Sequence, residues 1–121
     1  MEFYTFDKEV GKNITQFNSN FIMSKIIKTD KQTQIGCMHL EANGIVGFHQ
    51  AVVPQLLLVV SGEGWVRDDQ DSRVKIKTGD AVFWIKGEGH ETSTETGLTA
   101  IVIESEELTP ADFMSKRLKE F

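Results

Sequence analysis

The chain has 121 residues, which is enough for one hydrophobic core but too few for two ample ones, so we expect a single domain over residues 1–121. Its 13 Lys and Arg residues against 18 Asp and Glu residues give a formal net charge of −5, which argues against a nucleic-acid partner because phosphate backbones are repelled. Cys37 is the single cysteine of the sequence, and this excludes an internal disulfide and a cysteine-rich zinc module.

Residues 1–7 carry acidic side chains and no apolar run long enough for a signal peptide or a membrane span, so we expect a cytoplasmic protein with no membrane partner. Glycines then divide the chain into short segments rich in β-branched and aromatic residues, a pattern typical of short β-strands joined by turns. The expected strands are 21–29, 33–41, 55–60, 65–67, 73–77, 81–85 and 98–104.

Two of these segments indicate which of their faces are buried. Residues 73–77 alternate between charged and apolar side chains, so one face of this strand is buried and the other is wet. Residues 56–60 are all apolar, so both faces of this strand must leave water. The second face packs either against another subunit, which would make the protein a homodimer, or against the N-terminal segment, and the sequence leaves both possibilities open.

One helix is expected, at the C-terminus. Thr109 offers a capping hydroxyl, Pro110 fits the first turn of a helix, and Asp112 places an acid near the positive end of the helix dipole. Apolar side chains follow at helical spacing, so we expect a short helix over about residues 110–119 that packs against the sheets.

The most informative motif begins at His49, continues to Gln55 and reaches Gly62 after six further residues. A second segment runs from Gly79 through an aromatic-rich strand and a turn to His90. Together the two segments resemble the two motifs of the cupin superfamily, and the resemblance covers about residues 33–105. It implies an all-β, cupin-type double-stranded β-helix, that is, a jelly-roll barrel, and the short C-terminal helix expected from residues 110–119 would follow this barrel.

The match is incomplete at the positions that hold a metal in the cupin superfamily. The first motif of the family contains two histidines and a glutamate, and here His49 takes the first histidine position while Ala51 and Gln55 stand at the other two. His90 takes the histidine of the second motif. The family shell of three imidazoles and one carboxylate is therefore matched at two of four positions.

The resemblance implies that His49, Gln55 and His90 are the candidate metal ligands. Two neutral imidazoles suit a divalent transition metal such as Fe, Mn, Ni, Cu or Zn, and the amide oxygen of Gln55 is a weaker third ligand that brings no charge. Glu88 and Glu91 bracket His90 and are candidates for the missing carboxylate, although acids in loops are usually solvated. The residues expected to line the pocket around this site are Phe48, Ala51 and Trp84.

Two functions remain in competition at this point. The first is a metal-dependent enzyme, a dioxygenase, isomerase or lyase acting on a small organic substrate, for which the sequence indicates no dedicated general base and hence no assigned catalytic residue. The second is a non-catalytic barrel that binds or senses a small ligand without stoichiometric metal, which Ala51 and Gln55 favour. Fold resemblance alone does not decide between them, because cupins host many activities.

Overall fold

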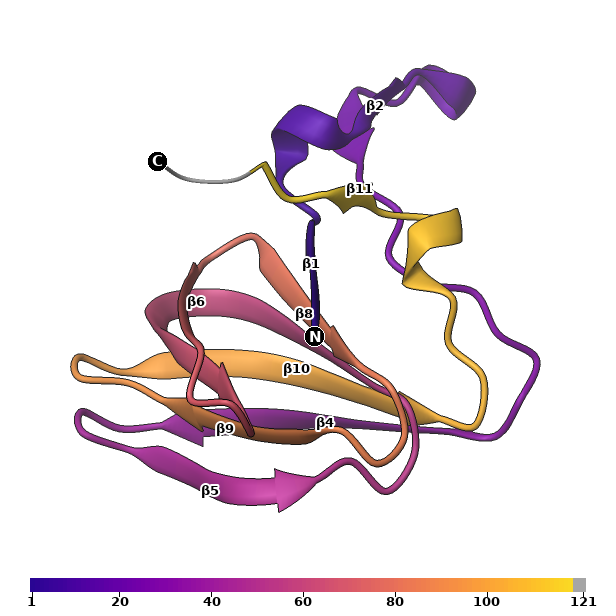
Figure 1. Cartoon of the computed structure of the whole chain (residues 1–121). Helices are drawn as coiled ribbons and strands as arrows, with labels where there is room; N and C mark the ends of the chain where they lie inside the picture. Colours follow the sequence, from indigo (N-terminus) through magenta and orange to yellow (C-terminus); the bar gives the residue numbers. More distant parts are fainter. Residues whose placement is uncertain (119–121) are drawn as a thin grey trace.

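One long strand, β6 (Gln55–Asp68), joins two antiparallel sheets that face each other (Figure 1). The computed structural model describes residues 1–118 of the chain. The other strands are β1 (Glu2–Thr5), β2 (Lys12–Ile14), β3 (Phe21–Met23), β4 (Thr33–Leu40), β5 (Ile45–Gln50), β7 (Arg73–Lys77), β8 (Asp80–Trp84), β9 (Gly89–Ser93), β10 (Leu98–Ser105) and β11 (Ser115–Lys116). Three single 3₁₀ turns complete the described part: η1 (Lys8–Val10), η2 (Gln16–Asn18) and η3 (Pro110–Asp112).

The two halves of β6 belong to different sheets. Its first half pairs with β8 and β10 in a sheet of strand order β11-β1-β8-β6-β10-β4. Its second half pairs with β7 and β9, and β9 in turn pairs with the edge strand β5. The change of partner falls at Gly62, which pairs with Leu98 of β10 while the next residue, Glu63, already pairs with Lys77 of β7. Gly62 has a positive φ of 82°, a conformation that favours glycine.

The inner core lies between the two sheets, and a second apolar layer covers the outer face of the larger one. Leu57 and Val59 of β6 face the inner core, whereas Leu56 and Leu58 alternate into the outer layer. The outer layer includes Tyr4 of β1 and, after β10, Leu108 and Met114. This arrangement explains why β6 has apolar residues on both faces: the chain's own N- and C-terminal segments cover the outer one.

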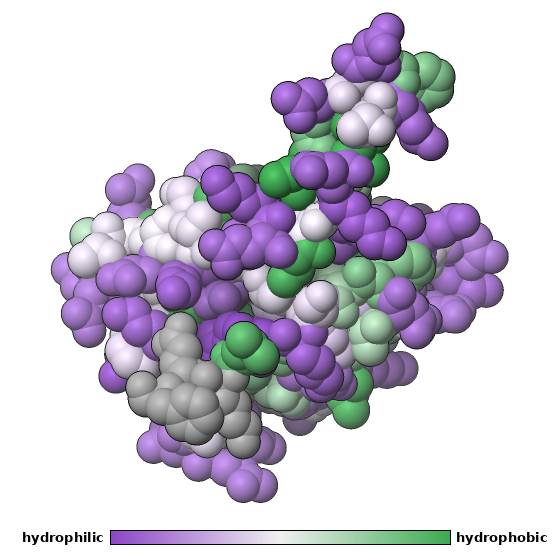
Figure 2. All heavy atoms as spheres, turned by 90° about the horizontal axis from the view of Figure 1, so that it is seen from above, coloured by the Kyte–Doolittle hydropathy of each residue, from purple (hydrophilic) through white to green (hydrophobic). Residues whose placement is uncertain are grey.

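Most of the expected strands are present, with some different limits. Residues 73–77 form β7 as expected, and residues 55–60 and 65–67 are parts of the single strand β6. The strand expected over 21–29 ends at Met23. It forms, with β2, a hairpin that projects from the body of the molecule (Figures 1 and 2).

The expected C-terminal helix is wrong. Only the 3₁₀ turn η3 forms, in which the Pro110 carbonyl accepts hydrogen bonds from the amides of Phe113 and Met114. The chain then extends, and Lys116 of β11 pairs with Tyr4 of β1. Pairing with β1 satisfies the backbone there in place of a helix, while the end of the expected helix, residue 119, lies outside the described residues. No helix in residues 1–118 is long and apolar enough to span a membrane.

Candidate functional site

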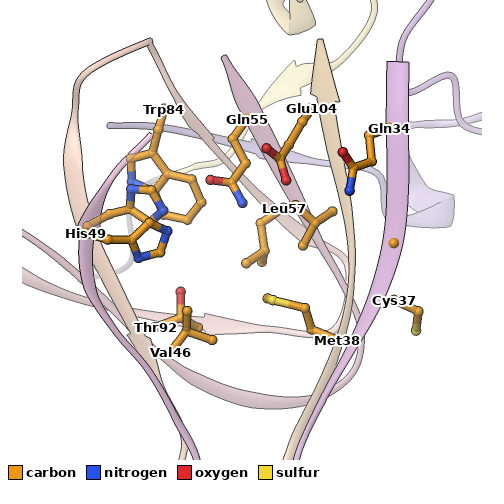
Figure 3. A pocket seen from close by; sticks show the side chains of 13 residues that line it. Gln34, Cys37, Met38, Val46, His49, Gln55, Leu57, Trp84, Thr92 and Glu104 are labelled. Carbon is orange, nitrogen blue, oxygen red and sulfur yellow. The ribbon is translucent and has the colours of Figure 1, made fainter. Parts of the chain in front are cut away.

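A cavity of about 290 Å³ lies between the two sheets (Figure 3). Its lower part is mostly apolar and is formed by side chains of both sheets, among them Met38, Val46 and Leu57, with Thr92 as a polar exception. Polar side chains occupy two opposite walls, the imidazole wall on β5 and β9 and the amide wall on β4, β6 and β10. This combination of an apolar interior with a few polar groups is typical of a small-molecule site.

The imidazole wall brings together the two histidines singled out from the sequence. His49 of β5 and His90 of β9 are direct partners in the antiparallel pair, and their ring centroids are 4.6 Å apart. A register shift between Val46 and His49 adds one residue to β5 relative to β9. This β-bulge explains why Val46 and His49, three positions apart, both line the cavity.

His90 is almost fully buried, with 2% of its surface exposed. Its ring stacks on the indole of Trp84, with 4.0 Å between the ring centroids and 15° between the planes. Burial lowers the pKa of His90, although a hydrogen bond to the Glu88 carbonyl acts in the opposite direction. The imidazole of His90 is therefore neutral at pH 7.

Backbone carbonyls fix the tautomer of both rings. The Nδ1 of His49 lies 2.8 Å from the Gly47 carbonyl oxygen, and the Nδ1 of His90 lies 3.2 Å from the Glu88 carbonyl oxygen. Because a carbonyl oxygen only accepts, each Nδ1 carries the hydrogen. In the neutral rings Nε2 then holds a lone pair, which can accept a hydrogen bond or bind a metal ion.

The amide wall consists of Gln34, Gln55 and Glu104, which line the cavity in one row (Figure 3). Glu104 on β10 is the register partner of Gln55 on β6 and, on its other side, of Gln34 on β4. Three adjacent strands thus place one carboxylate between two amides. No side-chain hydrogen bond or ion pair to these three groups comes from any of residues 1–118.

Solved structures share this fold over part of the chain, whereas neither the protein-family models nor the curated proteins give a match. A cupin superfamily protein from Desulfitobacterium hafniense superposes with a TM-score of 0.58 at 16% identity, over 69% of this chain and 74% of that one. The chain has the cupin fold. Similar cupin-fold structures include a predicted oxalate decarboxylase from Thermotoga maritima, with a TM-score of 0.54 at 27% identity over 59% of this chain and 64% of that one. An ethanolamine utilization protein from Salmonella typhimurium superposes with a TM-score of 0.54 at 23% identity, over 61% of this chain and 58% of that one.

Two expected pocket residues lie outside the cavity of this cupin fold. Phe48 is 43% exposed and packs beside Gly89, with the Arg67 guanidinium 5.0 Å from its ring centroid. Phe48 directly precedes His49, which lines the cavity, so the alternation of a strand turns its ring to the outer side. Ala51 does not reach the cavity either, because it is buried in the inner core. Trp84, by contrast, lines the cavity as expected.

The two acids considered as extra ligands, Glu88 just before β9 and Glu91 on β9, are bound elsewhere. Glu88 forms an ion pair with the N-terminal ammonium group and accepts a hydrogen bond from the Ile85 amide. Glu91 forms a bidentate pair with Arg67, with N–O distances of 2.9 and 3.1 Å. His39 is exposed and does not line the cavity. None of these side chains completes a metal shell.

A resident metal centre of the cupin kind does not fit the donor set of this chain. Within residues 1–118 no three or more His, Cys, Asp or Glu side chains are grouped so that they could hold a metal ion. Ala51, at the position of one family histidine, is a buried core residue, and Gln55 offers only a neutral amide. Two imidazoles remain, whereas a protein metal site normally has three or four protein ligands.

Sequence reasoning did not identify Gln34 and Glu104 as part of the site. A signal was available for Glu104, because it lies in phase with Ala100 and Val102 on the inner face of an expected strand. A carboxylate in phase with core residues is unusual and indicates a functional position. For Gln34 the corresponding signal is that it lies in phase with Met38, on the same face of an expected strand. This signal is weak, because an amide near the end of a strand is common.

Proposed function

We propose that this protein binds a small organic molecule in the cavity between its two sheets and that binding requires no metal ion. The observation that carries the proposal is the pair of opposed polar walls around one apolar interior. The imidazole wall offers hydrogen-bond acceptors at two Nε2 atoms, and the amide wall offers one carboxylate and two amides. Polar groups that lack a protein partner at a cavity are well placed to bind a ligand.

The indole of Trp84 lines the cavity beside the imidazole wall. Its Nε1 is buried and has no hydrogen-bond partner among the described residues. A buried N–H without a partner costs free energy, and such groups in native proteins usually have a reason. Trp84 lies against His90 at the cavity, so we interpret its stacked ring as a flat wall for a ligand.

The cavity volume limits the size of the ligand. A water molecule occupies about 30 Å³ in the liquid, so 290 Å³ corresponds to about ten heavy atoms. This is the size of a small metabolite rather than of a nucleotide or a peptide. The similar structures carry names as different as a predicted oxalate decarboxylase and an ethanolamine utilization protein, so the proposal is based on the site and not on any one neighbour.

A metal-dependent dioxygenase, isomerase or lyase is the competing hypothesis. The observation in its favour is the imidazole wall, where His49 and His90 each hold Nδ1 on a carbonyl and leave Nε2 free. Elemental analysis of untagged protein, together with the His49→Ala and His90→Ala variants, tests it for Fe, Mn, Ni, Cu and Zn. Stoichiometric metal that disappears in both variants would support the enzyme and contradict the metal-free proposal.

Gly36 offers a direct test of the cavity itself. It lies on β4 between Gln34 and Met38, and a Cβ built on it meets nothing within 4 Å. Because Gly36 lines the cavity and its Cβ position is open, we expect the side chain of the Gly36→Leu variant to occupy the cavity. We expect it to abolish the binding of small molecules found with a panel of alcohols, amines and carboxylates of at most about ten heavy atoms, measured by ligand-observed NMR.

Ser61→Leu is the matched control for this experiment. Ser61 is an exposed residue of β6 that does not line the cavity. Binding should persist in Ser61→Leu and vanish in Gly36→Leu. If Gly36→Leu binds the same molecules with unchanged affinity, the cavity is not the ligand site.

A further inference from the structure

Glu104 is the one acidic group of the cavity, and its surroundings within residues 1–118 leave its charge unmatched. The cavity lining contains no Lys or Arg, and no ion pair or hydrogen bond to the Glu104 carboxylate comes from this part of the chain. The side chain is nevertheless partly buried. Taking a carboxylate out of water without a partner is unfavourable, so a ligand that supplies a partner would be stabilised at this position.

The two neighbours of Glu104 extend its preference for hydrogen-bond donors. Gln34 and Gln55 flank Glu104 in register, and each can turn its amide oxygen toward the same group. Neither amide is held by another side chain of the described residues. The amide wall can therefore present three acceptors side by side: one carboxylate and two amide oxygens.

We infer that the ligand is an organic cation whose primary ammonium group binds Glu104 between Gln34 and Gln55. A primary ammonium has three N–H donors, which match the three acceptors of the amide wall. A hydrogen bond between two charged groups is about twice as strong as a neutral one, so it also selects the cation over an alcohol. This inference rests on the proposed function, because it names the class of ligand for the same cavity.

The remaining surfaces of the cavity fit the carbon part of such a ligand. Apart from Thr92, the lower part of the cavity is apolar and includes Leu57 and Met38, and the stacked rings of Trp84 and His90 provide a flat aromatic face. A hydrated divalent metal ion would gain nothing from these surfaces. The amide wall has one carboxylate and two neutral amides. Protein sites for hard divalent cations usually offer more charged oxygens than this.

Benzylamine and benzyl alcohol test the inference as matched probes. They have the same ring and nearly the same size, and benzylamine is protonated at pH 7. The Trp65→Phe variant leaves Trp84 as the single tryptophan of the chain, so its fluorescence reports on the cavity. We expect benzylamine to bind at least about tenfold more tightly than benzyl alcohol, because hydrogen bonds between charged groups are stronger than neutral ones.

Substitution of Glu104 shows whether this group makes the difference. In the Trp65→Phe background, Glu104→Gln should weaken benzylamine at least about tenfold and leave benzyl alcohol within about twofold. Glu106→Gln removes the same charge at an exposed position outside the cavity, so it should change neither the affinity for benzylamine nor that for benzyl alcohol. Glu104→Lys should reverse the preference, so that benzoate binds more tightly than benzylamine. Circular dichroism confirms that each variant is folded.

The outcomes separate this inference from the proposed function. The inference that the ligand is a cation is overturned if benzylamine and benzyl alcohol bind with equal affinity. It is also overturned if Glu104→Gln leaves the affinity for benzylamine unchanged. If Gly36→Leu still abolishes binding in that case, the cavity remains the ligand site. Displacement of benzylamine by stoichiometric Ca²⁺ or Zn²⁺ in a Glu104-dependent manner would mean that the site takes a metal ion, and this also overturns the inference.

Discussion

The imidazole of His90 lies face to face with the indole of Trp84, at 4.0 Å between ring centroids. The ring of His49 approaches the same imidazole to 4.6 Å at an angle of 57°. Packing between two aromatic rings keeps water away from His90, and burial is the main cause of its lowered pKa. The stacking that shapes the cavity wall therefore also sets the protonation state of the ring.

The lowered pKa of His90 predicts a stability that falls in mild acid. In the unfolded chain His90 takes up a proton near pH 6.5, whereas the folded protein resists protonation to lower pH. The unfolded state then binds more protons, so the free energy of unfolding decreases as the pH falls below about 6.5. Urea unfolding at pH 8.0, 6.5 and 5.5 in the presence of EDTA measures this effect.

His90→Gln is the control, because it removes the titrating group and leaves His39 and His49 in place. The variant should lose less stability than the wild type between pH 8.0 and 5.5. An NMR titration of the imidazole signals should place the midpoint of His90 below 6.5. The same pH slope in both proteins, or a midpoint above 6.5, would contradict the prediction.

Two glycines of the larger sheet should respond in opposite ways to alanine. Gly62→Ala places a Cβ 2.3 Å from the Gly97 carbonyl oxygen at a φ of 82°, so we expect it to destabilise the protein by about 3 kcal/mol. Gly36→Ala adds a methyl group in open space on a strand and should be neutral or stabilise by about 0.5–1 kcal/mol. Chemical denaturation of the two variants compares them, and equal effects would show that the crossing of β6 between sheets is not tightly packed.

The sequence predicted the fold well because its strongest signals coincide with the core. The apolar runs 55–60 and 98–104 became the central strands β6 and β10, and the alternating residues 73–77 became β7. The strands β5 and β9 were not expected from periodicity, since glycines, histidines and threonines there resemble loops. Their structure depends on mutual pairing and on β6, which a local pattern does not contain.

The imidazole wall of the site was predictable from the sequence, whereas on the amide wall only Gln55 was predicted. His49, Gln55, Trp84 and His90 all line the cavity as expected, because motif spacing fixes their positions on paired strands. Glu104 joins them only through the register of three strands, 49 residues from Gln55 in the chain. The metal ligation expected from the resemblance stays a prediction, as do the homodimer and the cytoplasmic location.

Tyr4 provides an optical test of the layer outside the larger sheet. Burial raises its pKa to about 12, with a further contribution from the hydrogen bond that its hydroxyl donates to Glu2. Tyr4 is the single tyrosine of the chain, so the absorbance of tyrosinate reads this residue alone. We expect a midpoint near 12 in the folded protein and near 10 in urea.

The raised pKa of Tyr4 also predicts where stability is lost. Above pH 10 the folded state retains the phenol proton of Tyr4, whereas the unfolded chain releases it. The contribution of Tyr4 to the free energy of unfolding is therefore fully present below pH 10 and is lost as the pH rises toward 12. Glu2→Gln removes the negative partner and should move the absorbance midpoint downward. Circular dichroism at each pH shows that the chain is still folded, and a midpoint near 10 in the folded protein would mean that Tyr4 is solvated.

Phe17 combines full exposure with an unfavourable backbone. It is 97% exposed at the turn between β2 and β3, and its φ of 60° and ψ of 32° lie in the left-handed region. An L-residue there costs about 1–2 kcal/mol, and asparagine tolerates this region better than phenylalanine. Phe17→Asn should therefore raise the free energy of unfolding by up to about 1 kcal/mol, since no buried contact is lost.

Phe21→Asn is the matched control for this prediction. Phe21 is 44% exposed in the strand β3, where the backbone is extended and asparagine is disfavoured, so the same substitution should be neutral or destabilising there. Urea unfolding and hydrogen exchange of the β2–β3 amides compare the two variants. If Phe17→Asn instead lowers the free energy of unfolding by more than about 1 kcal/mol, the relief of backbone strain is outweighed by lost contacts. Another surface must then cover this ring in solution. Sedimentation velocity of wild type and variant then identifies that surface as a second copy of the chain if the assembly dissociates.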